Sequence, residues 1–179
     1  SDDSLPELAP GVSANPPPEI HAAKSLDAAT PVTFDTDWSG ASTGLVTTVR
    51  AAWSKDALSL RFHLAGAGLN VDDTKPFETE REKLYEEDCV EFFFTPDAAE
   101  PNHYYEVEIG PKGHFFDLEV RRGAKLDVKK AIAWSSQPKI TTKSDPDQHT
   151  ADIEAVFRAP AIGKALKAGA TLPFALYRM

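Results

Sequence analysis

The sequence has 179 residues, which is long enough for one domain with a full hydrophobic core and no need of disulfides. Its 28 acidic and 19 basic side chains give a net charge of −9, which repels phosphate backbones and anionic headgroups. We therefore expect no nucleic acid and no membrane as partner. The single cysteine, Cys89, excludes an internal disulfide, and we interpret it as a small buried hydrophobic residue.

The first part of the chain differs from the rest in composition. Residues 1–23 are rich in Pro, Ala and acidic residues, and Pro16-Pro17-Pro18 favours an extended polyproline segment. We predict a tail or linker over 1–23 and a folded domain over 24–179. No apolar run reaches the roughly 18 residues that would span a bilayer.

Alternating residues predict a series of short strands. Segments 45–53 and 58–64 read as a hairpin whose second strand directs Leu60 and Phe62 inward and Arg61 and His63 outward. A second hairpin, 103–109 with 114–120, surrounds the turn at 110–113. Further strands are predicted over 131–134, 139–143, 151–158 and from 172 onward, with one helix over 160–167.

These elements predict an all-β protein, an antiparallel β-sandwich with one short helix. The predicted strand from 172 onward reaches residue 179 without a closing turn. We expect either a final strand there or a domain truncated at its C-terminal end.

The central segment 86–96 carries the most informative residue. Alternation sends Val90 and Phe92 to one face and Cys89 and Glu91 to the other. A carboxylate in mid-strand among aromatic residues is costly to desolvate. Glu91 therefore requires either an internal cation, with Arg81 and Arg178 as candidates, or a ligand.

The sequence offers little support for an enzyme. It contains no Gly-x-Ser-x-Gly elbow and no His-Glu-x-x-His spacing. Paired carboxylates for glycoside hydrolysis remain an alternative, and the acids that could converge across a sheet are Glu91, Glu106, Glu108, Asp117 and Glu119. Acid-rich strands are more often solvated faces, so we expect no catalysis.

A carbohydrate-binding surface agrees better with the residues. Sugar rings stack on aromatic side chains, and sugar hydroxyls bind to carboxylates and arginine. The candidate platforms are Tyr85, Tyr104 and Trp134. The candidate hydroxyl partners are Arg81, Asp88, Glu91 and Arg178.

Segment 85–96 resembles the signature of family 9 carbohydrate-binding modules and their DOMON-like relatives, in which an aspartate precedes Val-Glu-Phe and a later proline. Here these residues are Asp88, Val90-Glu91-Phe92 and Pro96. The flanking strands 49–62 and 104–117 and the late strand with Arg178 fit as well. The resemblance implies a secreted or periplasmic β-sandwich that binds sugars between two tryptophans, with calcium as a structural ion and other domains as neighbours. This sequence shows no counterpart of the tryptophan pair.

This interpretation includes a structural calcium ion, and two further alternatives to it concern a cofactor and partners. Calcium would bind at Asp72 and Asp73 or near Asp145 and Asp147. Some DOMON relatives bind haem b, for which Met179 and His63 could supply the ligands if their strands adjoin. An interaction module with no small ligand is the second alternative.

Overall fold

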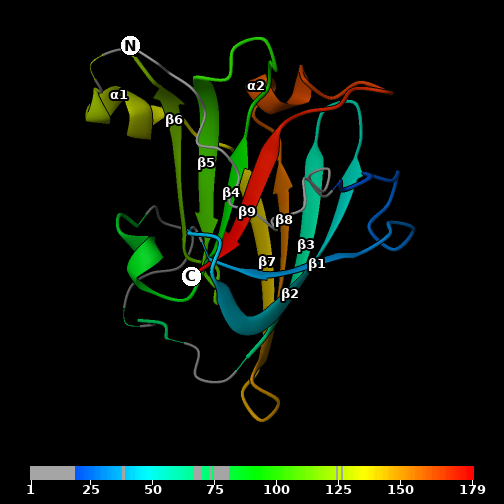
Figure 1. The fold of residues 1–179 in the computed structure, drawn as a ribbon, viewed down its shortest axis with the longest axis vertical. Coiled ribbons are helices and arrows are strands. Elements are labelled where there is room, and N and C mark those ends of the chain that lie inside the picture. The colour runs from blue at the N-terminus through cyan, green and yellow to red at the C-terminus, as the bar shows by residue number, and fades with distance from the viewer. Residues whose placement is uncertain are drawn as a thin grey trace, which may run out of the picture.

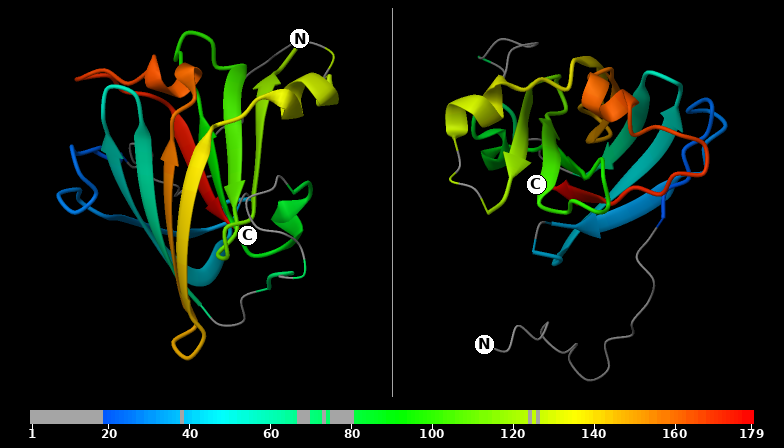
Figure 2. Two further views of the ribbon diagram at one scale, coloured as in Figure 1. Left: turned by 180° about the vertical axis from the view of Figure 1, so that it is seen from behind. Right: turned by 90° about the horizontal axis from the view of Figure 1, so that it is seen from above.

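The computed structural model describes residues 19–37, 39–66, 70–72, 74, 81–123, 125 and 127–179. These residues form two antiparallel sheets that face each other (Figure 1, Figure 2). The strand order is β1-β2-β3-β8-β7 in the five-stranded sheet and β6-β5-β4-β9 in the four-stranded sheet. The predicted antiparallel β-sandwich is therefore confirmed.

The five-stranded sheet contains both predicted strands of the first hairpin. Its strands are β1 (Val32–Thr36), β2 (Ser42–Trp53), β3 (Leu58–Ala65), β7 (Pro138–Asp145) and β8 (Thr150–Phe157). Leu60 and Phe62 are buried in the core, whereas Arg61 and His63 point to the outer surface, as the alternation predicts. Arg61 forms ion pairs there with Asp27 and Glu154.

The four-stranded sheet is built around the central segment. Its strands are β4 (Val90–Phe94), β5 (His103–Ile109), β6 (Phe115–Arg121) and β9 (Phe174–Arg178). Gly113, at a φ of 99° that other residues rarely adopt, lies in the predicted turn between β5 and β6. Phe92 on β4 stacks on Phe157 of β8 with ring centroids 6.2 Å apart. This contact joins the two sheets in the core.

The segment predicted as a strand over 131–134 is helical instead. Helix α1 (Val128–Ala133) begins at Asp127, whose side chain accepts a hydrogen bond from the backbone N–H of Lys130 at 3.2 Å. The local N-cap outweighs the short apolar run, which has no strand partner as the chain passes from β6 to β7. The predicted helix over 160–167 is shorter, α2 (Pro160–Gly163), and both helices lie at the same end of the sandwich (Figure 1).

The end of the predicted tail contacts the sandwich. Ala23 forms backbone hydrogen bonds with Ala51 and Trp53 of β2, and Ile20 packs against the core. Residues 1–18 lie outside the described part of the chain. No helix in the described residues is long and apolar enough to cross a bilayer.

Candidate functional site

The outer face of the four-stranded sheet carries a row of acids on neighbouring strands. Glu91 on β4 lies directly opposite Glu108 on β5, and Phe93 lies opposite Glu106. Glu91 also pairs with Tyr177 on β9. Because opposite residues in an antiparallel pair share a face, all of these side chains point away from the core. We call Glu91, Glu106 and Glu108 the carboxyl cluster.

The carboxyl cluster is buried although it faces outward. Glu91 is 6% exposed and Glu108 is 2% exposed, while Glu106 is partly buried. Burial, together with the neighbouring acids, raises the pKa of Glu108 to about 8 and that of Glu106 to about 7. Burial alone raises the pKa of Glu91. At neutral pH the cluster therefore holds protons and can both donate and accept hydrogen bonds.

No arginine neutralises the carboxyl cluster within the described part of the chain. Arg81 is buried and forms ion pairs with Glu87 and, at 3.7 Å, with Asp72. It also donates to the backbone oxygen of Asp72 at 3.0 Å. Arg81 thus fixes the segment before β4 and does not pair with Glu91.

Arg178 lies on the opposite face of the sheet from Glu91. It is 1% exposed, and its Nε donates to the backbone oxygen of Met179 at 3.3 Å. Burial lowers the pKa of Arg178, and the neighbouring Asp88 partly offsets this shift. The sequence analysis requires either an internal cation or a ligand to compensate the charge of Glu91. Neither Arg81 nor Arg178 is that cation.

Tyr85 lies beside the carboxyl cluster. It belongs to the 3₁₀ turn η1 (Leu84–Glu86), which packs against β5, and a hydrogen bond from its backbone to the Glu108 carboxylate partly offsets the rise in the pKa of that acid. The Tyr85 side chain is 48% exposed. An aromatic ring is therefore available to solvent at the rim of a buried polar row.

Asp88 connects two segments next to this site. Its carboxylate accepts a hydrogen bond from the backbone N–H of Asn70, and its own N–H donates to the Asn70 oxygen at 2.8 Å. Burial raises the pKa of Asp88, although the charge of Arg178 opposes the shift. Asp88 thus holds residue 70 against the start of β4.

Trp134 and Tyr104 occupy different faces of the four-stranded sheet. Trp134 follows α1 and stacks on the buried Tyr105, with ring centroids 4.3 Å apart, on the inner side. Tyr104 points outward, where its ring lies 6.2 Å from that of Phe93. Of the predicted aromatic platforms, the structure places Tyr85 and Tyr104 on the side of Glu91 and Trp134 on the other.

The residues considered for calcium and haem lie elsewhere. The Oδ1 of Asp72 accepts hydrogen bonds from Thr74, whereas Asp73 lies outside the described residues. His63 contacts Asp152 at 2.7 Å on the outer surface of β3, and Met179 follows β9 in the other sheet. Their strands do not adjoin, and neither residue lines the apolar cavity of about 800 Å³ between the sheets.

Sequence reasoning missed Glu106 and Glu108 as parts of a binding site. The sequence suggests these two acids only as candidates for a hydrolytic pair. Alternating acids on a strand usually face solvent, so they do not by themselves indicate a binding site. The signal that could have found them is their position two residues apart on one face of β5, next to a strand with an outward Glu91. Asp117 points instead to the inner side, where it accepts two hydrogen bonds from Ser136.

Comparison with known proteins identifies the fold. No protein-family model and no curated protein matches this sequence. A crystal structure of a protein from Bacteroides uniformis, provisionally described as carbohydrate-binding, is similar with a TM-score of 0.58 at 15% identity. The match covers 83% of this chain and 70% of that chain.

Two structures of a family 9 carbohydrate-binding module from Caldicellulosiruptor kristjanssonii, with glucose and with cellotriose, are also similar. Both have a TM-score of 0.48, at 17% and 16% identity, and each match covers 76% of this chain. The matches cover 60% and 58% of those chains. The chain thus shares its fold with the Bacteroides protein. Family 9 modules are among the similar structures.

Proposed function

We propose that this chain is a non-catalytic carbohydrate-binding domain that binds sugars at the outer face of the four-stranded sheet. The observation that carries the proposal is the position of Tyr85, exposed at 48%, beside the buried carboxyl cluster. A sugar ring can stack on the tyrosine while its hydroxyls reach Glu106, the partly buried member of the carboxyl cluster. The Bacteroides uniformis protein with the same fold is described provisionally as carbohydrate-binding, which supports the same proposal.

The protonation of the cluster suits a neutral ligand. Sugar hydroxyls donate and accept hydrogen bonds, and so does a set of carboxyl groups that shares protons near neutral pH. A hydroxyl that bonds to Glu106 gives this partly buried carboxyl group a hydrogen-bond partner. Satisfying such groups contributes more to affinity than an exposed contact does.

The proposal includes a location outside the cytoplasm, secreted or periplasmic, where oligomeric carbohydrates are encountered. It assigns no hydrolysis to the glutamates. Fractionation of the cells that produce the protein would check the location.

Calorimetric titration with neutral mono- and oligosaccharides, glucose and cellotriose among them, tests the proposed function. We expect saturable binding at millimolar sugar or below, without release of reducing ends during the measurement. An absence of binding across the panel would contradict the proposal and favour an interaction module with no small ligand. Release of new reducing ends would contradict the non-catalytic assignment.

A further inference from the structure

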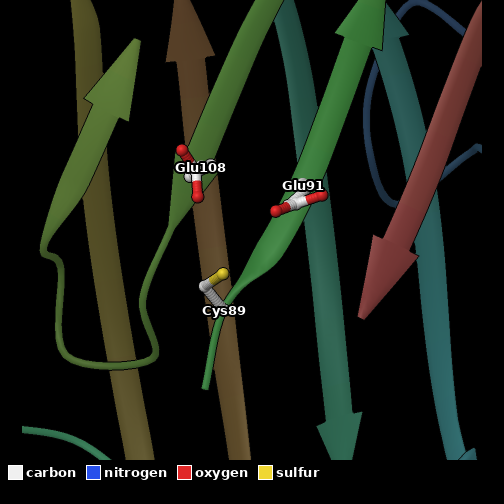
Figure 3. A group of neighbouring side chains, drawn as sticks. All are labelled: Cys89, Glu91 and Glu108. Carbon is white, nitrogen blue, oxygen red and sulfur yellow. The ribbon is translucent and has the colours of Figure 1, made fainter. Parts of the chain in front are cut away.

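Cys89 lies next to two members of the carboxyl cluster. The Sγ of Cys89, one carboxylate oxygen of Glu91 and one of Glu108 all lie within 4.8 Å of one another. Figure 3 shows the three side chains gathered between the start of β4 and the adjoining part of β5. All three are buried, and Cys89 is fully so. A thiol and two carboxyl groups thus meet in a small space that is nearly closed to water.

One atom of this group has no hydrogen-bond partner. The Oε1 of Glu108 is buried and has no hydrogen-bond partner, and the residue is only 2% exposed. A buried acceptor without a partner carries the uncompensated cost of its removal from water, so native proteins rarely leave one unused. Glu91 lies directly opposite Glu108, so ionisation of both acids would place two like charges side by side and cause repulsion. A positive charge between the two carboxylates would satisfy the free oxygen and remove the repulsion.

The donor set selects the kind of cation. Calcium prefers six to eight oxygen ligands and does not use a thiolate. Zinc binds thiolate sulfur and carboxylate oxygen together, in tetrahedral sites with ligand atoms about 3.5 Å apart. Three protein ligands leave a fourth position for water or for a ligand oxygen. The three atoms, all within 4.8 Å of one another, exceed this separation by at most about 1.3 Å.

We propose that Cys89, Glu91 and Glu108 form a binding site for a thiophilic divalent cation, zinc in the first place. Cys89 supplies a thiolate, whose proton leaves when the metal binds, and the two glutamates supply one oxygen each. Glu106, the next acid on this face and only partly buried, extends the set of oxygen donors along the sheet. The proposal depends on these side chains alone and not on sugar binding.

Titration of the chelator-treated protein with Co²⁺ and Zn²⁺ in the absence of sugar tests the site. We expect one Co²⁺ per chain, a thiolate-to-cobalt charge-transfer band in the near ultraviolet, and loss of that band when Zn²⁺ displaces the cobalt. Removal of a ligand in Glu108→Gln should weaken zinc binding by about 100-fold or more. Cys89→Ser should abolish the band and weaken zinc binding at least about tenfold.

A matched control addresses an exposed contact between a histidine and a carboxylate away from the proposed site. His63→Ala removes the exposed imidazole beside Asp152 and should leave both titrations unchanged. Far-ultraviolet circular dichroism checks the fold of each variant, and Cys89→Ala replaces the serine variant if that one does not fold. The proposal is overturned if the wild-type protein shows no thiolate band, if zinc binds equally well to the Cys89 and Glu108 variants, or if His63→Ala abolishes binding.

Discussion

Arg178 on β9 lies directly opposite Val90 on β4, so the arginine enters the inner face of the sheet that carries Glu91 on its outer face. The two residues that the sequence suggests as an ion pair are therefore separated by the sheet itself. Glu91 instead faces Glu108, another acid. The proposed sugar site and the proposed metal site both follow from this arrangement of buried acids without a basic partner.

The Tyr85 ring should contribute to sugar binding but not to stability. Tyr85→Ala removes the stacking surface, and we expect sugar affinity to fall by about tenfold, or ~1.4 kcal/mol. Tyr85→Phe keeps the ring and should bind almost as well as the wild type. Calorimetry on both variants measures the difference. Equal affinity in the alanine variant and the wild type would show that the sugar binds elsewhere.

Protonation of the carboxyl cluster should make stability depend on pH. The pKa values of Glu106 and Glu108 are raised to about 7 and about 8 from an ordinary value of 4.5. The folded chain therefore binds more protons than the unfolded chain between these limits, and the free energy of unfolding falls as pH rises from about 4.5 to about 8. Their stabilising contribution is complete below pH 4.5 and lost above pH 8.

Urea unfolding of the chelator-treated protein across this pH range measures the effect. In Glu108→Gln the decline should be smaller, because one of the two groups no longer titrates. Glu100→Gln, which changes an exposed acid in the loop between β4 and β5, serves as the control and should keep the wild-type slope. A slope that is the same in all three proteins would refute the raised pKa of Glu108.

The buried arginine before η1 should matter more than an exposed one. Arg81→Ala leaves the partly buried Glu87 without its ion-pair partner, and we expect a loss of about 3 kcal/mol in the free energy of unfolding. Arg61→Ala breaks pairs with the more exposed Asp27 and Glu154 and should cost about 1 kcal/mol or less. Urea unfolding of the two variants compares these losses directly. Equal losses would contradict the structural role given to Arg81.

The contact between the sheets should dominate the stability of the core. Phe157 is fully buried and stacks on Phe92, so Phe157→Ala should cost about 3–5 kcal/mol. Tyr85→Ala removes a ring of similar size from an exposed position and should change stability by no more than about 0.5 kcal/mol. Chemical denaturation gives both values. A small loss in the Phe157 variant would indicate that the sheets are held mainly by other contacts.

The sequence alone was sufficient for most of the fold. Period-two alternation in 58–64 and around Glu91 correctly predicted which side chains enter the core, because the alternation is a property of each strand by itself. The predicted type of secondary structure is wrong at 131–134, where two local signals compete. At 131–134 the apolar run suggested a strand, but the Asp127 cap favoured a helix.

The arrangement of the candidate site could not be read from the sequence, because it depends on which strands are neighbours and in which register. Alternation shows that Glu91 points away from Phe92, but only the pairing of β4 with β5 and β9 places Glu108 opposite Glu91 and Arg178 on the other face. A shift of one residue in either pairing would exchange these partners. The composition of the faces was thus determined locally, whereas the meeting of Cys89, Glu91 and Glu108 was decided by long-range strand pairing.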